Sequence, residues 1–199
     1  MSRHLDHLKA HVIAGFNITC VGDERAHSYL PSKAENTISD QVAKHVLKWF
    51  DPFYAEYSWR DRGSDERQYC VPGNNFPIAS IMRTKYGKYP EYHTSLDDFN
   101  VMAPKGLEGG YMALQKALTA LERSSFPQVR VYGEPQLGKR GLYPTVGSKV
   151  SNKHGRLMLD VMSYCDEKMS LLDIAERCDV PIWELYTMID VLHEQELIF

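Results

Sequence analysis

Short β-prone runs alternate with helix-like segments through the first 125 residues of this 199-residue chain. Four such runs, which we expect to be strands, cover residues 15–22, 26–31, 55–61 and 77–84. Apolar residues at helical spacing predict a helix over residues 37–50. Pro104 fits the first turn of another helix, whose apolar stripe is formed by Tyr111, Leu114, Leu118 and Leu121. Strands that alternate with helices in this way predict an α/β domain with a parallel or mixed sheet.

The composition changes toward the end of the chain. Residues 151–199 hold four Lys and Arg against ten Asp and Glu, a net charge of −6, whereas residues 1–150 carry +3. Ser170 and Asp173 have the spacing of a capping box, and Pro181 interrupts the helical pattern shortly afterwards. We therefore expect an α/β domain over residues 1–125, a linker over 126–152 that holds a short strand at 128–133, and a small all-α, winged helix-turn-helix domain over 153–199.

Several classes of protein are disfavoured by the sequence. No stretch approaches the roughly 20 apolar residues that span a bilayer, and the first residues lack the apolar core of a secretory signal. We expect a cytoplasmic protein without membrane contact, whose four cysteines are free thiols because no pair has C-x-x-C spacing. The sequence also lacks the H-E-x-x-H, P-loop, G-x-S-x-G and dinucleotide-binding motifs.

Residues that bind metals in other proteins occur in the loops that follow the expected strands. Asp23 comes directly after the run 15–22, Asp65 and Glu66 lie in the loop GSDERQYC, and His93 lies in EYHTSLDD. Sites in open α/β sheets gather where strands end, and carboxylates with imidazoles are zinc ligands. A lone Asp after a strand is also a common turn residue, and a lone His in a loop is often simply solvated. These residues alone leave both interpretations open.

The segments GFNITCVGD and GSDERQYCVPGNNFPIASIMRTKYGKYPEYHTSLDD resemble a bacterial family of aminopeptidase-like proteins encoded with surface-polysaccharide genes. That family is similar to the two-zinc aminopeptidases and ends in a winged helix. The resemblance implies that Asp23 and His93 bind metal, one to each of two zinc ions. It also implies that Ser64, Asp65 and Tyr69 lie at the substrate pocket.

The chain departs from this family pattern before Asp23. A complete two-zinc peptidase also needs an upstream histidine, a bridging aspartate and a glutamate that acts as general base. Only 22 residues precede Asp23, and the acidic and histidine residues among them do not resemble those segments. We therefore expect the carboxy-terminal part of such a protein, whose one or two zinc ions are not necessarily retained. A missing amino-terminal segment or a homo-oligomer would complete the site.

Three hypotheses of function follow from this pattern. The first is a zinc aminopeptidase-like hydrolase of small peptides or acyl-amino sugars, weakly active or inactive alone, and the second is a non-catalytic scaffold or regulator in surface-polysaccharide biosynthesis. The third is a thiol enzyme with Cys70 as nucleophile and His93 as base. Nucleic-acid binding is not expected, because the candidate recognition helix 181–195 contains no Lys or Arg.

Overall fold

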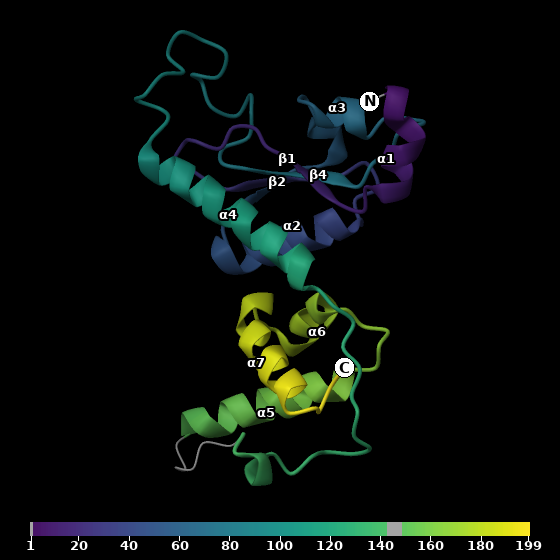
Figure 1. Cartoon of the computed structure of the whole chain (residues 1–199). Helices are drawn as coiled ribbons and strands as arrows, with labels where there is room; N and C mark the ends of the chain where they lie inside the picture. The colour runs from purple at the N-terminus through teal and green to yellow at the C-terminus, as the bar shows by residue number, and fades with distance from the viewer. Residues whose placement is uncertain (1, 143–148) are drawn as a thin grey trace. The chain divides into compact units, whose positions relative to one another are not determined.

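A computed structural model describes residues 2–142 and 149–199, which divide into two compact units, residues 1–118 and 119–199. The helices and strands of the first unit, with the helix that leads out of it, are η1 (Ser2–His4), α1 (Leu5–His11), β1 (Gly15–Asn17), β2 (Ser28–Leu30), α2 (Ile38–Phe50), β3 (Ala55–Glu56), η2 (Trp59–Asp61), α3 (Glu66–Tyr69), β4 (Ile78–Met82) and α4 (Pro104–Arg123). Figure 1 follows them from purple to teal, and the mixed α/β architecture agrees with the expected fold class.

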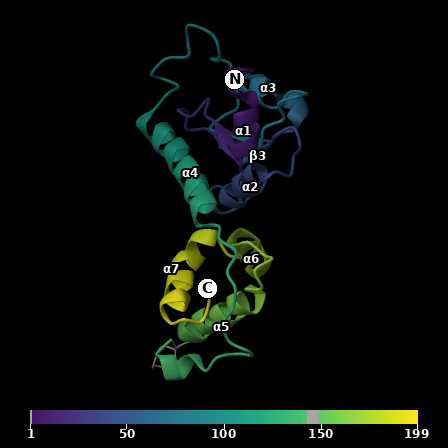
Figure 2. The ribbon, with the colours of Figure 1, turned by 45° about the vertical axis from the view of Figure 1, so that its right-hand side comes forward.

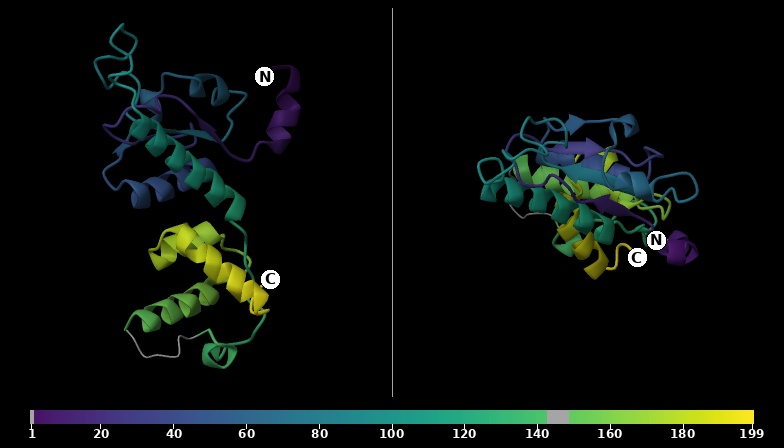
Figure 3. Two further views of the ribbon diagram at one scale, coloured as in Figure 1. Left: turned by 60° about the vertical axis from the view of Figure 1, so that its left-hand side comes forward. Right: turned by 90° about the horizontal axis from the view of Figure 1, so that it is seen from above.

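The sheet of the first unit has the strand order β1-β4-β2-β3. β1 runs parallel to β4 with Phe16 opposite Ala79, whereas β2 runs antiparallel to β4 with Tyr29 opposite Ile81. Helices α2 and α4 lie on one face of the sheet and α3 lies on the other (Figures 1 and 3). Because β1 and β4 are parallel, the loops that leave their carboxyl ends meet at the same edge.

Helix α2 forms where the spacing of apolar residues predicts it. Thr37 and Asp40 make a capping box at its start, and its apolar face is buried against β2 and β4. Asp40 is only 1% exposed, and its carboxylate accepts hydrogen bonds from the side chains of Tyr29, Ser32 and Thr37. The capping box therefore also anchors the loop that connects β2 to this helix.

Two local expectations are wrong. The run 55–61 forms a strand only at Ala55–Glu56, because the Ser58–Asp61 capping box turns the following residues into the short helix η2. The segment 128–133, expected to hold a short strand, makes only isolated bridges, which pair Gln128 with Asp166 and Val129 with Ile198.

Helix α4 buries several of its small residues, whereas two residues of its predicted apolar stripe are exposed. Gly106, Gly110 and Ala113 are buried, whereas Tyr111 is 62% exposed and Leu118 is 55% exposed. A Cβ atom on Gly106 would lie 2.0 Å from the carbonyl oxygen of Gly22. The backbone of α4 therefore approaches the loop after β1 so closely that only small residues fit there, and the large apolar residues are turned outward.

The second unit contains η3 (Leu137–Arg140), α5 (Lys149–Tyr164), α6 (Leu171–Cys178) and α7 (Ile182–Glu194), drawn in green and yellow in Figure 2. The capping box of Ser170 and Asp173 starts α6 as expected, and Asp179 ends it in the left-handed conformation. Ile174, Ile182 and Leu185 are fully buried in the shared core. The unit also includes the expected linker 126–152, of which residues 143–148 lie outside the described residues.

Candidate functional site

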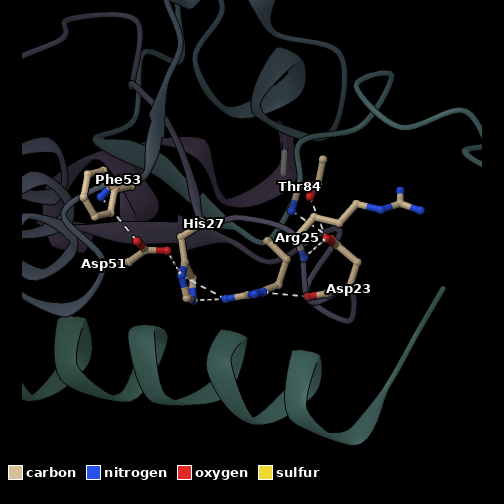
Figure 4. Close-up of polar contacts among 7 residues, drawn as sticks. Asp23, Arg25, His27, Asp51, Phe53 and Thr84 are labelled. Atoms are coloured by element: carbon tan, nitrogen blue, oxygen red, sulfur yellow. Dashed lines mark hydrogen bonds and ion pairs between the residues drawn. The ribbon is translucent and has the colours of Figure 1, made fainter.

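The carboxylate of Asp23 is held rigidly at the edge where β1 and β4 end. Asp23 is 6% exposed, and its two oxygens accept hydrogen bonds from the Thr84 hydroxyl at 2.6 Å, the Thr84 N–H at 2.8 Å and the Arg25 N–H at 2.9 Å (Figure 4). Thr84 belongs to the segment that leaves β4, so these bonds join the two strand ends. A carboxylate held in this way can act as a ligand for a cation or as a clamp between the two strand ends.

A buried chain of polar groups supports the backbone of Asp23. Arg83 Nε donates to the carbonyl oxygen of Asp23 at 2.7 Å, and Arg83 Nη1 contacts the ring nitrogens of His27. On its other side, His27 Nδ1 lies 2.8 Å from Asp51 Oδ2. Since a carboxylate only accepts hydrogen bonds, we assign the proton to Nδ1, which leaves Nε2 to accept from Arg83. Figure 4 shows this chain running from Asp51 through His27 to Asp23.

The local electrostatics of this chain favour an ionised Asp51. Its partial burial alone would raise the pKa of the carboxyl group. The hydrogen bonds from His27 and from the Phe53 N–H outweigh that effect, so the pKa of Asp51 lies below its ordinary value. The ionised Asp51 therefore orients the imidazole ring of His27 toward Arg83.

A second buried carboxylate, Glu66, lies in the loop between β3 and β4. It accepts hydrogen bonds from the N–H groups of Gly63 and Ser64, from the Tyr86 hydroxyl at 2.7 Å and from Asn17 Nδ2 at 3.1 Å. Burial would raise the pKa of Glu66, but these donors outweigh burial and lower the pKa. Asn17 ends β1 and Tyr86 follows β4, so Glu66 too ties together the strand ends.

The residues predicted from the sequence occupy different settings. His93 is exposed, adopts a left-handed φ of 58°, and stacks its ring on Tyr92 at a centroid distance of 4.0 Å. Ser64 is half-buried and contributes its N–H to Glu66, whereas Asp65 is exposed at the start of α3. Tyr69 is half-buried, and its carbonyl oxygen accepts from the Phe76 N–H. Over residues 2–142 and 149–199 no hydrogen bond or ion pair joins Asp23 to His93.

Whether the described residues can hold a metal ion depends on the types and the number of ligands that they offer. An aspartate and a histidine are suitable donors for zinc, and Asp23 is oriented for the task. Across the part of the chain that the structure describes, no group of three or more His, Cys, Asp or Glu side chains is arranged to hold a metal. The described residues therefore offer one buried carboxylate and one exposed imidazole, fewer than the three protein ligands of a typical catalytic zinc site.

Cys70 occupies a position that does not suit a nucleophile. It is fully buried, and its thiol donates to the carbonyl oxygens of Phe76 at 3.2 Å and Ile78 at 3.5 Å. Burial raises the pKa of the Cys70 thiol, which disfavours the reactive thiolate. The hypothesis of a Cys70–His93 pair is therefore wrong, because the thiol is a packing group and His93 lies on the surface.

Sequence reasoning missed the residues that organise this site. His27, Asp51 and Arg83 come from three separate segments, and no spacing relates them before the chain folds. Glu66 lies beside Asp65 in the sequence, so the pattern indicated an acidic loop without showing which carboxylate is buried. One usable signal was Arg83, a cation directly after an apolar strand.

The fold defines a mixed α/β unit followed by a small helical unit. Residues 1–124 match a profile described as a domain of unknown function (DUF4910), and residues 125–199 match a winged helix-turn-helix profile. Because the first match covers more than half of the chain, the protein belongs to the DUF4910 family, and its second unit is a winged helix.

A named relative and a solved structure, both from Clostridium acetobutylicum, extend this assignment. One, provisionally named a polysaccharide biosynthesis protein with aminopeptidase-like domain, is 33% identical over 200 residues that cover 100% of this chain and 46% of the relative. A 2.37 Å crystal structure, provisionally described as a peptidase, is 32% identical with a TM-score of 0.88, and the match covers 100% of this chain and 44% of that one. The chain thus spans less than half the length of these relatives.

No helix within residues 2–142 and 149–199 is long and apolar enough to cross a membrane.

Proposed function

We propose that this chain is the carboxy-terminal part of a zinc aminopeptidase-like hydrolase, to which it contributes metal ligands and the substrate pocket. The observation that carries the proposal is the geometry of Asp23, a buried carboxylate fixed by three hydrogen bonds beyond the end of β1. Metal-binding carboxylates are typically oriented by such donors. Zinc, when bound, would supply a water of lowered pKa.

In this proposal Asp23 and His93 are ligands of one or two zinc ions, and further ligands come from outside the described residues. The mostly exposed segment 87–102, which carries His93, contacts the Asp23 segment through the Arg25–Glu91 ion pair at 2.8 Å, so the two candidate ligands belong to neighbouring segments. Ser64, Asp65 and Tyr69 would line the pocket for a small peptide or an acyl-amino sugar. The proposed location is the cytoplasm.

A general base is not assigned within this chain. Asp51 orients His27, and Glu66 already accepts four hydrogen bonds, so neither carboxylate is free to take a proton from a water molecule. A base typically contributes a factor of about 10² to 10⁴ to catalysis. We therefore propose little or no hydrolysis by this chain alone, and substantial activity only when other residues complete the site.

The alternative is a non-catalytic scaffold or regulatory protein in surface-polysaccharide biosynthesis. The observation in its favour is that the Asp23 carboxylate is already well bonded to Thr84 and Arg25. A carboxylate in this position can act purely as a clamp between two strand ends. Metal binding distinguishes the two functions, because a clamp needs no zinc.

The deciding experiment is the zinc content of the purified chain, measured by plasma mass spectrometry after dialysis against low-micromolar zinc. The proposal expects bound zinc that falls in both Asp23→Ala and His93→Ala. Matched controls are Glu108→Ala and His154→Ala, which remove an exposed carboxylate and an exposed imidazole elsewhere. Bound zinc that is unchanged in the two site variants would favour the scaffold, as would the absence of zinc from a complex in which other residues complete the site.

A further inference from the structure

Strand β1, which has three residues, lies at one edge of the sheet. It pairs with β4 on one side, and the strand order places it last on the other. Edge strands are normally blunted by short length, charged residues, proline or bulges, and of these β1 has the short length. The segment 13–18 contains no charge and no proline, and Ile13 is 80% exposed while Ile18 is 64% exposed. This edge has the properties of a strand that pairs with another polypeptide.

The neighbouring helix α4 presents a second apolar surface. Leu107 is 42% exposed and Tyr111 is 62% exposed, one helical turn apart. Gly106 and Gly110, each one residue earlier and so about 100° around the helix, lie against the backbone at residues 21–22 in the segment that follows β1. The outward face of α4 thus flanks the segment that continues from the open strand. We call Ile13, Ile18, Leu107 and Tyr111 the assembly surface.

Helix α1 lacks an apolar packing partner as well. It immediately precedes β1 in the sequence, yet none of its residues is buried. A helix of seven residues is too short to be stable without tertiary contacts. Its position agrees with a surface that another polypeptide covers.

The length of the relatives identifies the occupant. This chain aligns over its whole length with only 46% and 44% of two relatives at 33% and 32% identity. More than half of each relative therefore has no counterpart among these 199 residues. A second copy of this chain would add only further copies of Asp23 and His93, whereas the unmatched part adds different residues.

We infer that the assembly surface binds a polypeptide equivalent to the unmatched part of these relatives, which adds a strand to the open edge of β1 and packs on α4. Strand addition supplies backbone hydrogen bonds, and the apolar side chains on either side supply the burial that stabilises the contact. The inference rests on the proposed function in one respect, because this partner would also bring the missing zinc ligands.

The test is co-expression of this chain with the unmatched part of the Clostridium acetobutylicum relative, followed by light scattering of the purified material. The expected result is a 1:1 complex. The relative's own matched part, expressed with the same partner, is the positive control for assembly. The N–H groups of Phe16 and Asn17 point to opposite edges of the strand, so the one at the open edge should exchange with deuterium more slowly in the complex than in the chain alone, while the other serves as an internal reference.

Substitutions on the assembly surface locate the contact. Ile18→Glu and Leu107→Glu should each weaken the complex at least about tenfold, equivalent to about 1.4 kcal/mol. Tyr132→Glu is the matched control, since Tyr132 is a fully exposed aromatic residue of the second unit. Circular dichroism of each variant shows whether it folds.

Three results would overturn the inference. In the first, this chain fails to assemble with the partner while the two parts of the relative do assemble. In the second, both Glu variants bind the partner with unchanged affinity. In the third, this chain forms a homodimer through the same residues. The zinc measurement remains independent. A complex without zinc would refute the proposed function and leave the inference about the assembly surface intact. Zinc bound by a chain that does not assemble would support the proposed function and refute that inference.

Discussion

Thr84 donates two hydrogen bonds to Asp23, one from its hydroxyl at 2.6 Å and one from its N–H at 2.8 Å. The two residues are 61 positions apart and follow the ends of the parallel strands β1 and β4. The same two hydrogen bonds therefore orient the candidate ligand Asp23 and link the segments that follow β1 and β4.

Thr84→Val removes the hydroxyl donor and preserves the shape of the side chain. Loss of a hydrogen bond to a buried charged group is expected to lower the free energy of unfolding by about 1.5–3 kcal/mol. If the chain binds zinc, its affinity should fall about 10- to 100-fold, as for other residues that orient a ligand. Urea unfolding and zinc titration measure the two effects.

Thr84→Ser is the control for this substitution, because it retains the hydroxyl group and should restore most of both properties. If the Val variant is as stable as the parent chain, the hydroxyl bond does not support Asp23 in solution.

Periodicity predicted much of the fold because it reports on burial within one element. The apolar spacing over 37–50 and the capping box at Ser170 mark helices whose ends are decided by neighbouring residues. The same reasoning misjudged α4, where Tyr111 and Leu118 look like a buried stripe. Its packing is decided by the close approach of Gly106 to Gly22, a tertiary contact that leaves no periodic trace.

The site was less accessible to sequence reasoning than the fold. Asp23 was identified through its place after a strand and through the family resemblance. His27, Asp51 and Arg83 were not, because each looks like an ordinary surface residue until the chain folds. Buried polar chains of this kind depend on long-range pairing, which a single sequence does not encode in any local pattern.

Glu66 should make stability depend on acid. Since its pKa in the folded chain is below the ordinary value of 4.5, its ionised form stabilises the fold above about pH 4.5. That contribution is lost as the pH falls through the lower folded-state pKa. Glu66→Gln should therefore lower the free energy of unfolding by about 1.5–3 kcal/mol at pH 7, and by less at pH 3.

Urea unfolding of both proteins between pH 3 and pH 7 measures this difference. Asp51, whose pKa is also lowered, should preserve part of the acid dependence in the variant. Glu108→Gln is the matched control, because Glu108 is exposed on α4 and should have little effect. An equal loss of stability at pH 3 and pH 7 would show that the charge of Glu66 is not what stabilises the loop.

Gly106→Ala tests the close approach of α4 to the loop after β1. Alanine in a helix normally stabilises it by about 1 kcal/mol relative to glycine. Here the new methyl group would meet the Gly22 carbonyl oxygen at 2.0 Å, so we expect a net loss of about 1–3 kcal/mol. At Gly109 the nearest atom is Nη1 of the Arg83 side chain at 3.0 Å, and Gly109→Ala should cost less. Thermal unfolding compares them, and a Gly106→Ala variant more stable than the parent would contradict this packing.

The four cysteines should differ sharply in reactivity. Cys70 and Cys165 are at most 1% exposed, and burial raises the pKa of Cys165 to about 12. Cys20 and Cys178 are half-buried. An aromatic disulfide reagent at pH 8 should therefore label Cys20 and Cys178 first, and the buried pair only when the chain unfolds. Peptide mapping identifies the labelled sites, and rapid labelling of Cys70 would reopen the thiol-enzyme hypothesis.

The winged helix is expected not to bind DNA. Its helix α7 carries Glu184, Asp190 and Glu194 without Lys or Arg, and residues 151–199 have a net charge of −6. Arg123, a cation near this helix, is held by Asp190 at 2.7 Å and lies over the Tyr186 ring at 4.9 Å, so its charge is already compensated. Phosphate neutralisation by cations supplies most non-specific affinity for DNA.

Fluorescence anisotropy of a labelled DNA duplex tests whether the chain binds DNA. At about 0.15 M salt we expect no binding up to about 100 μM protein, the weak limit of ordinary non-specific association. Asp190→Ala is the informative variant, because it releases Arg123 and removes one acidic charge from α7. If the parent chain binds with steep salt dependence, cations outside α7 must contact the phosphates. If neither protein binds, the acidic winged helix is better explained as a surface for contacts with other proteins.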